Sequence, residues 1–129
     1  MISTDAFSYI NVLDKAADAS WTRENLIANN IANATTPGYK RQDIDFQSVL
    51  KKEISNYKYM NLDQKINNMD LGKLNPQIYT DHANFSYRLD KNNVDIDTEQ
   101  VELASEQIKY QALTTSINSE FQRLQSVLK

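Results

Sequence analysis

The stretch "LIANNIANATTPGYK", residues 26–40, begins with a helical pattern and ends in a turn. It contains one of the chain's two prolines and one of its two glycines, side by side at Pro37 and Gly38. Proline ends a helix because its ring clashes with the preceding turn and its nitrogen has no proton to donate. The sequence Thr36-Pro37-Gly38-Tyr39 fits a type II turn, whose third residue needs a positive φ. We therefore predict that a helix ends near Asn33, a suitable C-cap because Asn tolerates the left-handed region.

The N-terminal helix is predicted over residues 1–33, with Ser3 or Thr4 as its N-cap. Apolar residues recur in it at alternating steps of three and four, which is typical of a coiled-coil seam. Ser20 and Glu24 interrupt the seam. Its apolar members from this helix are Ile10, Leu13, Ala17, Ile27 and Ile31.

A second amphipathic helix is predicted over residues 97–129. Asp97 or Thr98 is the expected N-cap, and Asp97 with Gln100 resembles a capping box. Glu106 and Glu120 interrupt its apolar stripe. The seam residues from this helix are Leu103, Tyr110, Leu113, Ile117, Phe121 and Leu124.

The middle segment, residues 34–96, begins with the turn at residues 36–39, which we call the elbow. The sequence after the elbow shows little periodicity. A short helix is predicted from Phe46 to Ile54, and residues 50–83 are interpreted as mobile, with local structure at best. Residues 84–89 alternate like a strand and, with residues 94–96, predict a small hairpin. Tyr57, Tyr59, Met60 and Met69 are either interface anchors or scattered exposed residues, and the sequence does not decide between them.

The predicted fold is mainly α, with long N- and C-terminal helices that pair as a coiled-coil-like bundle around a loop-rich middle segment. The length of 129 residues indicates one domain. Two helices cannot hide both apolar faces from water, and lone helices are marginally stable. We therefore favour packing of the seam between subunits. The alternative is an ordinary two-helix core within a monomer.

Composition excludes several classes of function. The chain has no Cys, so it has no disulfide or thiolate metal site. The net charge is −3 without a basic stripe, so nucleic-acid binding is not expected. No apolar run is long enough to cross a membrane. The N-terminus lacks the charged and apolar regions of a cleaved signal peptide.

Candidate catalytic and metal-binding residues are few. His82 is the sole histidine and has no evident orienting partner in its segment, so we interpret it as a solvated surface residue. The acidic group Asp90, Asp95, Asp97 and Glu99 lacks the glycine of a calcium loop, and it suits the start of a helix instead. We predict a protein that is not an enzyme, with no metal, no cofactor and no small-molecule substrate.

A ten-residue signature lies between Asn30 and Tyr39. It closely resembles the N-terminal signature of the bacterial flagellar axial proteins, which are the rod, hook and hook-associated subunits. The matching residues are Asn30, Ala32, Asn33, Thr36, Pro37, Gly38 and Tyr39. Residues 92–124 and the short length resemble proximal rod subunits of the FlgB type. One departure is residues 91–93, where the family pattern leads us to expect a glycine.

This resemblance implies a structural subunit of the proximal rod of the flagellar basal body. Such proteins leave the cytoplasm through the flagellar type III export apparatus, without signal cleavage, and lie in the cell envelope and periplasmic space. Their implied partners are further copies, other proximal rod proteins and the rod adaptor at the membrane-embedded base. The implied product is a helical tube that encloses the export channel and transmits torque. The alternative is a small acidic helical export chaperone or adaptor of a type III secretion system, which leaves the elbow unexplained.

Helix propensity does not explain why asparagines precede the elbow. Asn29 and Asn30 both lower helix propensity. We hypothesise that their amides form hydrogen bonds either across subunits or back to the elbow. Either arrangement would fix the angle at which the helix meets its neighbour.

Overall fold

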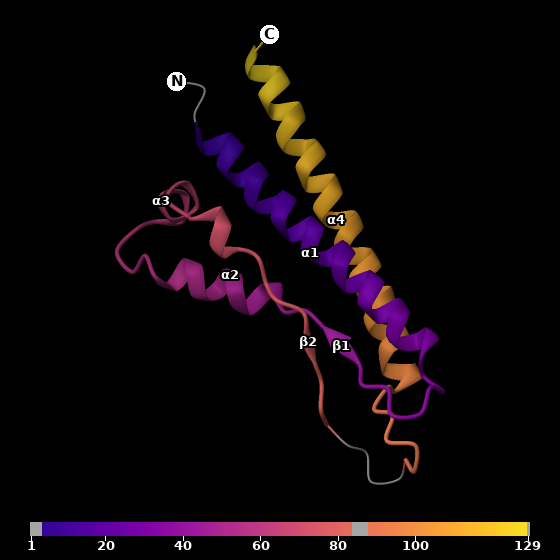
Figure 1. Ribbon diagram of the computed structural model, residues 1–129. Coiled ribbons are helices and arrows are strands. Elements are labelled where there is room, and N and C mark those ends of the chain that lie inside the picture. Colours follow the sequence, from indigo (N-terminus) through magenta and orange to yellow (C-terminus); the bar gives the residue numbers. More distant parts are fainter. Residues whose placement is uncertain (1–3, 84–87, 129) are drawn as a thin grey trace.

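The computed structural model describes residues 4–83 and 88–128. Two long helices dominate it, α1 (Thr4–Ala32) and α4 (Ile96–Leu128). They pack side by side and run in opposite directions, so both ends of the chain lie at the same end of the molecule (Figure 1). This pair confirms the predicted mainly α fold with long terminal helices. None of the helices in the described residues is long and apolar enough to cross a membrane.

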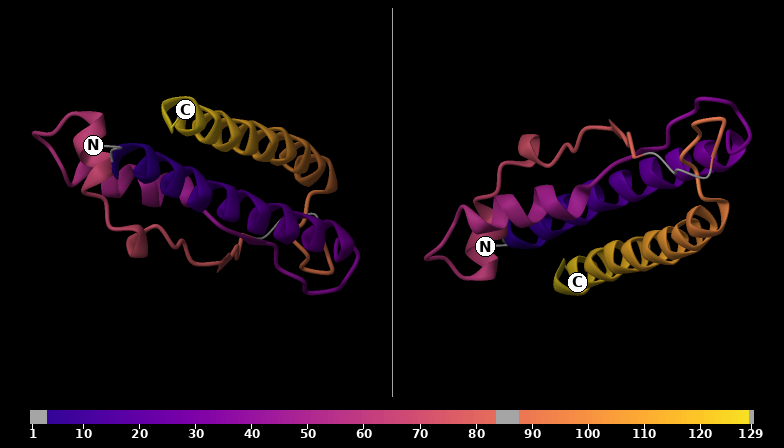
Figure 2. Two further views of the ribbon diagram at one scale, coloured as in Figure 1. Left: turned by 90° about the horizontal axis from the view of Figure 1, so that it is seen from above. Right: turned by 90° about the horizontal axis from the view of Figure 1, so that it is seen from below.

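In the residues that the structure describes, the middle segment contains five short elements between the long helices. They are β1 (Gln42–Asp43), α2 (Phe46–Ser55), α3 (Leu62–Asn67), a 3-10 helix η1 (Leu71–Lys73) and β2 (Tyr79–Thr80). Figure 2 shows α1 between α4 on one side and this segment on the other. Helix α1 therefore contacts α4, α3, β1 and η1, and it is the central element of the fold.

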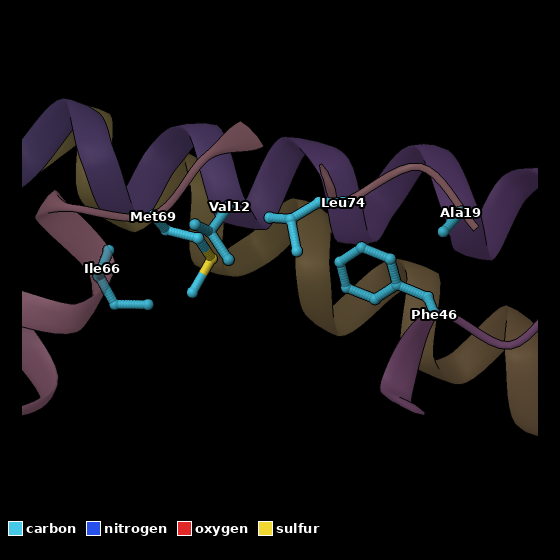
Figure 3. Close-up of a cluster of buried hydrophobic side chains, with 6 residues drawn as sticks. All are labelled: Val12, Ala19, Phe46, Ile66, Met69 and Leu74. Atoms are coloured by element: carbon cyan, nitrogen blue, oxygen red, sulfur yellow. The ribbon is translucent and has the colours of Figure 1, made fainter. Parts of the chain in front are cut away.

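A hydrophobic cluster joins the middle segment to α1. Its buried members are Val12, Ala19, Phe46, Ile66, Met69 and Leu74 (Figure 3). Three of them come from residues 50–83, so this segment has more structure than its sequence pattern indicated. The pattern missed the cluster because its members belong to separate short elements that share no common period. The mobility of the segment stays a prediction.

A small two-stranded antiparallel sheet lies in the middle segment, as predicted, but other residues form it. Gln42 pairs with Thr80 and Asp43 with Tyr79. The predicted hairpin was misplaced: residues 84–87 lie outside the described part, and residues 94–96 form no strand. The Val94 N–H donates to the side chain of Asn92 at 2.8 Å, and Ile96 already begins α4.

The helix caps differ in part from the predictions. Asp95, not Asp97 or Thr98, caps α4, because its Oδ1 accepts from the N–H groups of Asp97 at 3.1 Å and Thr98 at 3.3 Å. The predicted short helix after the elbow is confirmed as α2, and Asp45 caps it by accepting from the Ser48 N–H. Of the two N-caps proposed for α1, Ser3 lies outside the described residues and Thr4 is the first residue of the helix.

Candidate functional site: a polar junction at the elbow

The elbow turn has the predicted type II geometry. Gly38 has a φ of 74°, and the Tyr39 N–H donates to the Thr36 carbonyl at 3.2 Å. Asn33 follows the last residue of α1 but does not adopt the left-handed conformation. Its side-chain Nδ2 instead donates to the Asn29 carbonyl at 2.9 Å. Asn33 therefore caps the helix through its amide group.

Asn30 connects α1 to the chain beyond the elbow. Its side chain is fully buried, and its Oδ1 accepts from the Tyr39 hydroxyl at 3.0 Å and from the Gln42 N–H at 2.9 Å. Its Nδ2 donates to the Gln42 carbonyl at 2.9 Å and to Glu99 Oε2 at 3.2 Å. The amide thus satisfies both backbone groups of Gln42, as a neighbouring strand would. Burial raises the pKa of the Tyr39 phenol, which keeps its hydroxyl able to donate.

The side chain of Asn92 binds the backbone carbonyls that follow the C-terminal end of α1. Its Nδ2 lies 2.8 Å from the Asn33 carbonyl, 3.0 Å from that of Ala34 and 2.9 Å from that of Thr36. The last carbonyls of a helix have no partner within the helix, so an outside donor must satisfy them. Asn92 supplies that donor and is itself fully buried.

Asn93 joins two further backbone segments. Its Oδ1 accepts from the Arg41 N–H at 2.8 Å, and its Nδ2 donates to the Asp81 carbonyl at 2.7 Å. Lys91, just before the pair, has a φ of 61° and is the sole non-glycine residue in the described ranges with a positive φ. The glycine expected in this stretch is therefore replaced by a lysine in a conformation that favours glycine.

Arg23 links α1 to β1 and α4 through three carboxylates. Its Nε lies 2.9 Å from Asp43 Oδ1, its Nη2 3.0 Å from Glu102 Oε2 and its Nη1 2.8 Å from Glu106 Oε2. Glu106 is almost fully buried on the apolar stripe that it interrupts. Burial opposes the charge of Arg23, but the hydrogen bonds to Asp43 and Glu106 outweigh it and raise the arginine pKa.

Arg41 binds a second set of three carboxylates, next to the set that Arg23 binds. Its Nε lies 2.6 Å from Glu99 Oε1, its Nη2 3.1 Å from Asp43 Oδ2 and its Nη1 3.3 Å from Asp81 Oδ2. Burial would raise the pKa of Asp43, but hydrogen bonds from Arg23 and from the Ile44 N–H outweigh it and lower that pKa. Asp43 is therefore a shared anion between the two arginines. We call this whole set the polar junction: Arg23, Asn30, Arg41, Asp43, Asn92, Asn93, Glu99 and Glu106.

The structure brings together only part of the predicted elbow motif. Asn30 belongs to the polar junction and Tyr39 donates to it, while Ala32, Thr36, Pro37 and Gly38 are exposed. Of the two arrangements in the hypothesis about the asparagines, the one within the chain is present: Asn30 bonds back to the elbow, and Asn29 donates to the Tyr39 hydroxyl at 3.3 Å.

The predicted seam residues lie at different depths. Ile10, Ala17 and Ile27 are buried, whereas Phe121 is 47% exposed. The remaining seam residues are partly buried: Leu13, Ile31, Leu103, Tyr110, Leu113, Ile117 and Leu124.

Sequence reasoning missed most of the charged residues of the junction. Glu106 was seen only as an interruption, although Glu99, Glu106 and Leu113 recur at intervals of seven on one stripe. A buried carboxylate on such a stripe needs a cationic partner, which points to an arginine elsewhere in the chain.

The residues considered for calcium and catalysis have other roles or none. Asp95 caps α4, and Glu99 accepts from Arg41. His82 is exposed. Within the described ranges, no group of three His, Cys, Asp or Glu side chains is placed to hold a metal ion.

Comparison with known proteins assigns the family. A family model described as "Flagella basal body rod protein" matches residues 10–40, which cover most of α1 and the elbow. The flagellar basal body rod protein FlgB of Bacillus subtilis is 36% identical over 119 residues, covering 92% of each chain. The FlgB proteins of Proteus mirabilis and Escherichia coli are 36% and 32% identical, each covering 83% of both chains.

The chain belongs to the FlgB family of flagellar basal body rod proteins. It is therefore a structural protein of the rod, located in the flagellar basal body. The matched stretch contains Arg23 and Asn30 of the polar junction, and also Tyr39, which donates to Asn30.

Proposed function

We propose that this chain is a proximal rod subunit that assembles with other rod components into a helical tube. The tube encloses the export channel and transmits torque. The observation that carries the proposal is the polar junction, in which the signature residue Asn30 bonds both to Glu99 of α4 and to the backbone after the elbow. Buried polar networks favour a single geometry, and a subunit that transmits torque needs a fixed angle between its long helices.

We further propose the partners and the route that the sequence implied. The partners are further copies of this chain, other proximal rod proteins, the rod adaptor and the flagellar type III export apparatus. The chain would then lie in the cell envelope and periplasmic space after export without a cleaved signal peptide. Similarity to FlgB proteins over 92% of the chain does not favour the chaperone or adaptor alternative. We infer no catalytic role.

The seam residues are proposed to serve assembly as well as the contact between α1 and α4. Support comes from the open end of the helix pair, where both helices carry exposed apolar residues. Phe7 is 51% exposed, Phe121 47% and Val127 71%. Exposed apolar side chains continue along both helices, at Trp21, Val101 and Ile108, and a large exposed apolar area is typical of a surface that another protein covers.

Substitution of the seam in α4 tests the proposal. In the bacterium that encodes the chain, we expect Ile117→Asp or Phe121→Asp to abolish rod assembly, because a carboxylate cannot be buried unpaired between subunits. Export of the variant should persist. The measurements are swimming motility and immunoblots of isolated basal bodies and of the exported fraction. Ser119→Asp, at an exposed position on the same helix, is the matched control. Motile cells with the Ile117→Asp or Phe121→Asp chain in their rods would show that the seam does not serve assembly.

A further inference from the structure

An acidic cleft opens beside the polar junction, between α1, α4 and the start of α2. Four carboxylates and two cations line it: Asp43, Asp45, Glu102 and Glu106 with Arg23 and Lys109. Its walls therefore carry a net charge of −2, whereas the whole chain carries −3. Glu102 and Lys109 keep 40% and 38% of their side chains exposed, so charge at the cleft remains open to a partner.

Glu106 gives this cleft an unused acceptor. The side chain is 2% exposed, and its Oε2 is bonded to Arg23. Its Oε1 is buried and has no hydrogen-bond donor among the described residues, and Lys109 Nζ is 3.7 Å away. A buried carboxylate oxygen without a hydrogen-bond donor is energetically unfavourable. This oxygen therefore has an ion pair with Lys109 but no hydrogen bond, and a donor from another molecule would satisfy it.

A basic loop projects from the other end of α2. We define it as Lys58, Tyr59 and Met60, all of which are exposed, and Lys51 and Lys52 in the second half of α2 are exposed as well. Tyr59 is 100% exposed and Met60 40%, whereas Met69 is buried in the hydrophobic cluster. The structure therefore separates the residues whose role the sequence left open. Tyr59 and Met60 remain available as interface anchors, and Met69 belongs to the core.

The basic loop does not reach the cleft of its own chain. Asp45 and Phe46, at the start of α2, line the cleft, and the loop follows Ser55 at its end. A ten-residue helix is about 15 Å long, so α2 holds the two surfaces apart. Figure 1 shows the turn between α2 and α3 projecting away from the pair formed by α1 and α4. A partner for either surface must therefore come from another molecule.

We propose that the basic loop of one copy docks into the acidic cleft of the next copy. The charges are complementary: three exposed lysines face a cleft of net charge −2. Tyr59 supplies an aromatic anchor of the kind that dominates interface energy. Two different surfaces meet, so the contact is heterologous and repeats without closing on itself, which builds a helical array. This inference rests on the proposed rod function and assigns the surfaces through which copies meet.

Cysteine pairs test the contact directly, because the chain has no cysteine of its own. One copy carries Lys58→Cys and a co-expressed copy carries Ser105→Cys, a position that lines the cleft and is exposed. We expect a short bis-maleimide to give a product of dimer mass in isolated basal bodies only when both variants are present. The matched control replaces Ser105→Cys by Ser119→Cys, about 21 Å further along α4, and should give no such product.

The outcomes separate this inference from the proposed function. Basal bodies that contain both variants but give no dimer product would overturn the docking of copies. A product of another mass from Lys58→Cys alone would assign the loop to a different rod protein and would also overturn it. Absence of the unsubstituted chain from basal bodies would instead contradict the proposed rod function.

Charge reversal gives a second readout. Like charges that face each other across an interface cost several kcal/mol, so Lys58→Glu should lower the amount of chain in basal bodies by about tenfold or more. Arg123→Glu makes the same change in charge at a side chain that is 77% exposed on α4, and it should leave the amount unchanged. Equal amounts for the two variants would show that the loop lysine makes no such contact.

Discussion

The polar junction and the hydrophobic cluster both fasten other parts of the chain to α1, but by different physics. The cluster attaches the middle segment to the N-terminal half of α1 through Val12 and its apolar neighbours. The junction attaches α4 and β1 to the C-terminal half through Arg23 and Asn30. Apolar contacts depend on area and tolerate many shapes, whereas hydrogen bonds and ion pairs demand distances and angles.

The difference teaches what each region contributes. An apolar cluster mainly supplies free energy, and loss of one member leaves a cavity. A buried ionic network contributes little net free energy, because desolvation offsets attraction, but loss of one member leaves uncompensated charge. We therefore interpret the cluster as the source of stability for the middle segment and the junction as the source of the fixed angle between the long helices.

The largest expected effect comes from Arg23→Ala in the junction. Asp43 and Glu106 would lose their main cation while still buried, which costs about 3–5 kcal/mol of unfolding free energy. Chemical denaturation of the purified protein measures this loss. Arg123→Ala, which breaks an exposed ion pair with Glu120, should change it by less than about 0.5 kcal/mol. A loss below about 1 kcal/mol for Arg23→Ala would show that the network is not buried as described.

The matching change in the cluster is Leu74→Ala. Leu74 is 1% exposed, and truncation of a buried leucine costs about 2–4 kcal/mol through lost burial and a cavity. Leu62→Ala, at a side chain that is 57% exposed, is the control and should cost much less. Since the two regions share no partner, the costs of Leu74→Ala and Arg23→Ala should add to within about 0.5 kcal/mol in the double variant. Strong coupling between them would contradict the separation of the two regions.

The long helices and the elbow were predictable because their signals are local. Pro37 and Gly38 specify the turn by themselves, and the apolar period specifies each helix. The pairing of α1 with α4 followed from their similar length and their apolar stripes. The resemblance to the flagellar axial proteins was likewise readable, because it lies in contiguous residues around Asn30, and residues 92–124 with the short length indicated the FlgB type.

The junction and the sheet were not predictable, because their partners lie far apart in the chain. Arg41 and Glu99 are separated by 58 positions, and no periodicity connects them. The hairpin prediction failed because residues 94–96, its expected second strand, form no strand. The Val94 N–H bonds to the side chain of Asn92 instead, which alternation in the sequence does not reveal. Asp95 was missed as a cap because Asp97 offered a better-looking capping box with Gln100.

Asn30→Ala tests whether the junction controls the angle rather than the helix itself. The change removes four hydrogen bonds and leaves the partly buried backbone groups of Gln42 without this partner, so we expect a loss of about 2 kcal/mol. Helical content by circular dichroism should stay near that of the unsubstituted chain, while rod assembly is impaired. The control is Asn29→Ala, at an exposed residue whose amide donates to Tyr39 at 3.3 Å. Normal rods with Asn30→Ala would contradict the hypothesis that this amide fixes the angle between α1 and α4.

The smallest expected effect is a gain at Lys91. A non-glycine residue in the left-handed conformation costs roughly 1–2 kcal/mol, and a glycine there avoids that cost but loses more chain entropy on folding. Lys91→Gly should therefore raise the free energy of unfolding by about 0.5 kcal/mol. Lys91→Ala removes the same charge and keeps the backbone strain, so it is the matched control. Denaturant midpoints would distinguish the two, and equal midpoints would mean that the backbone at Lys91 is not strained and that the junction tolerates a lysine there without cost.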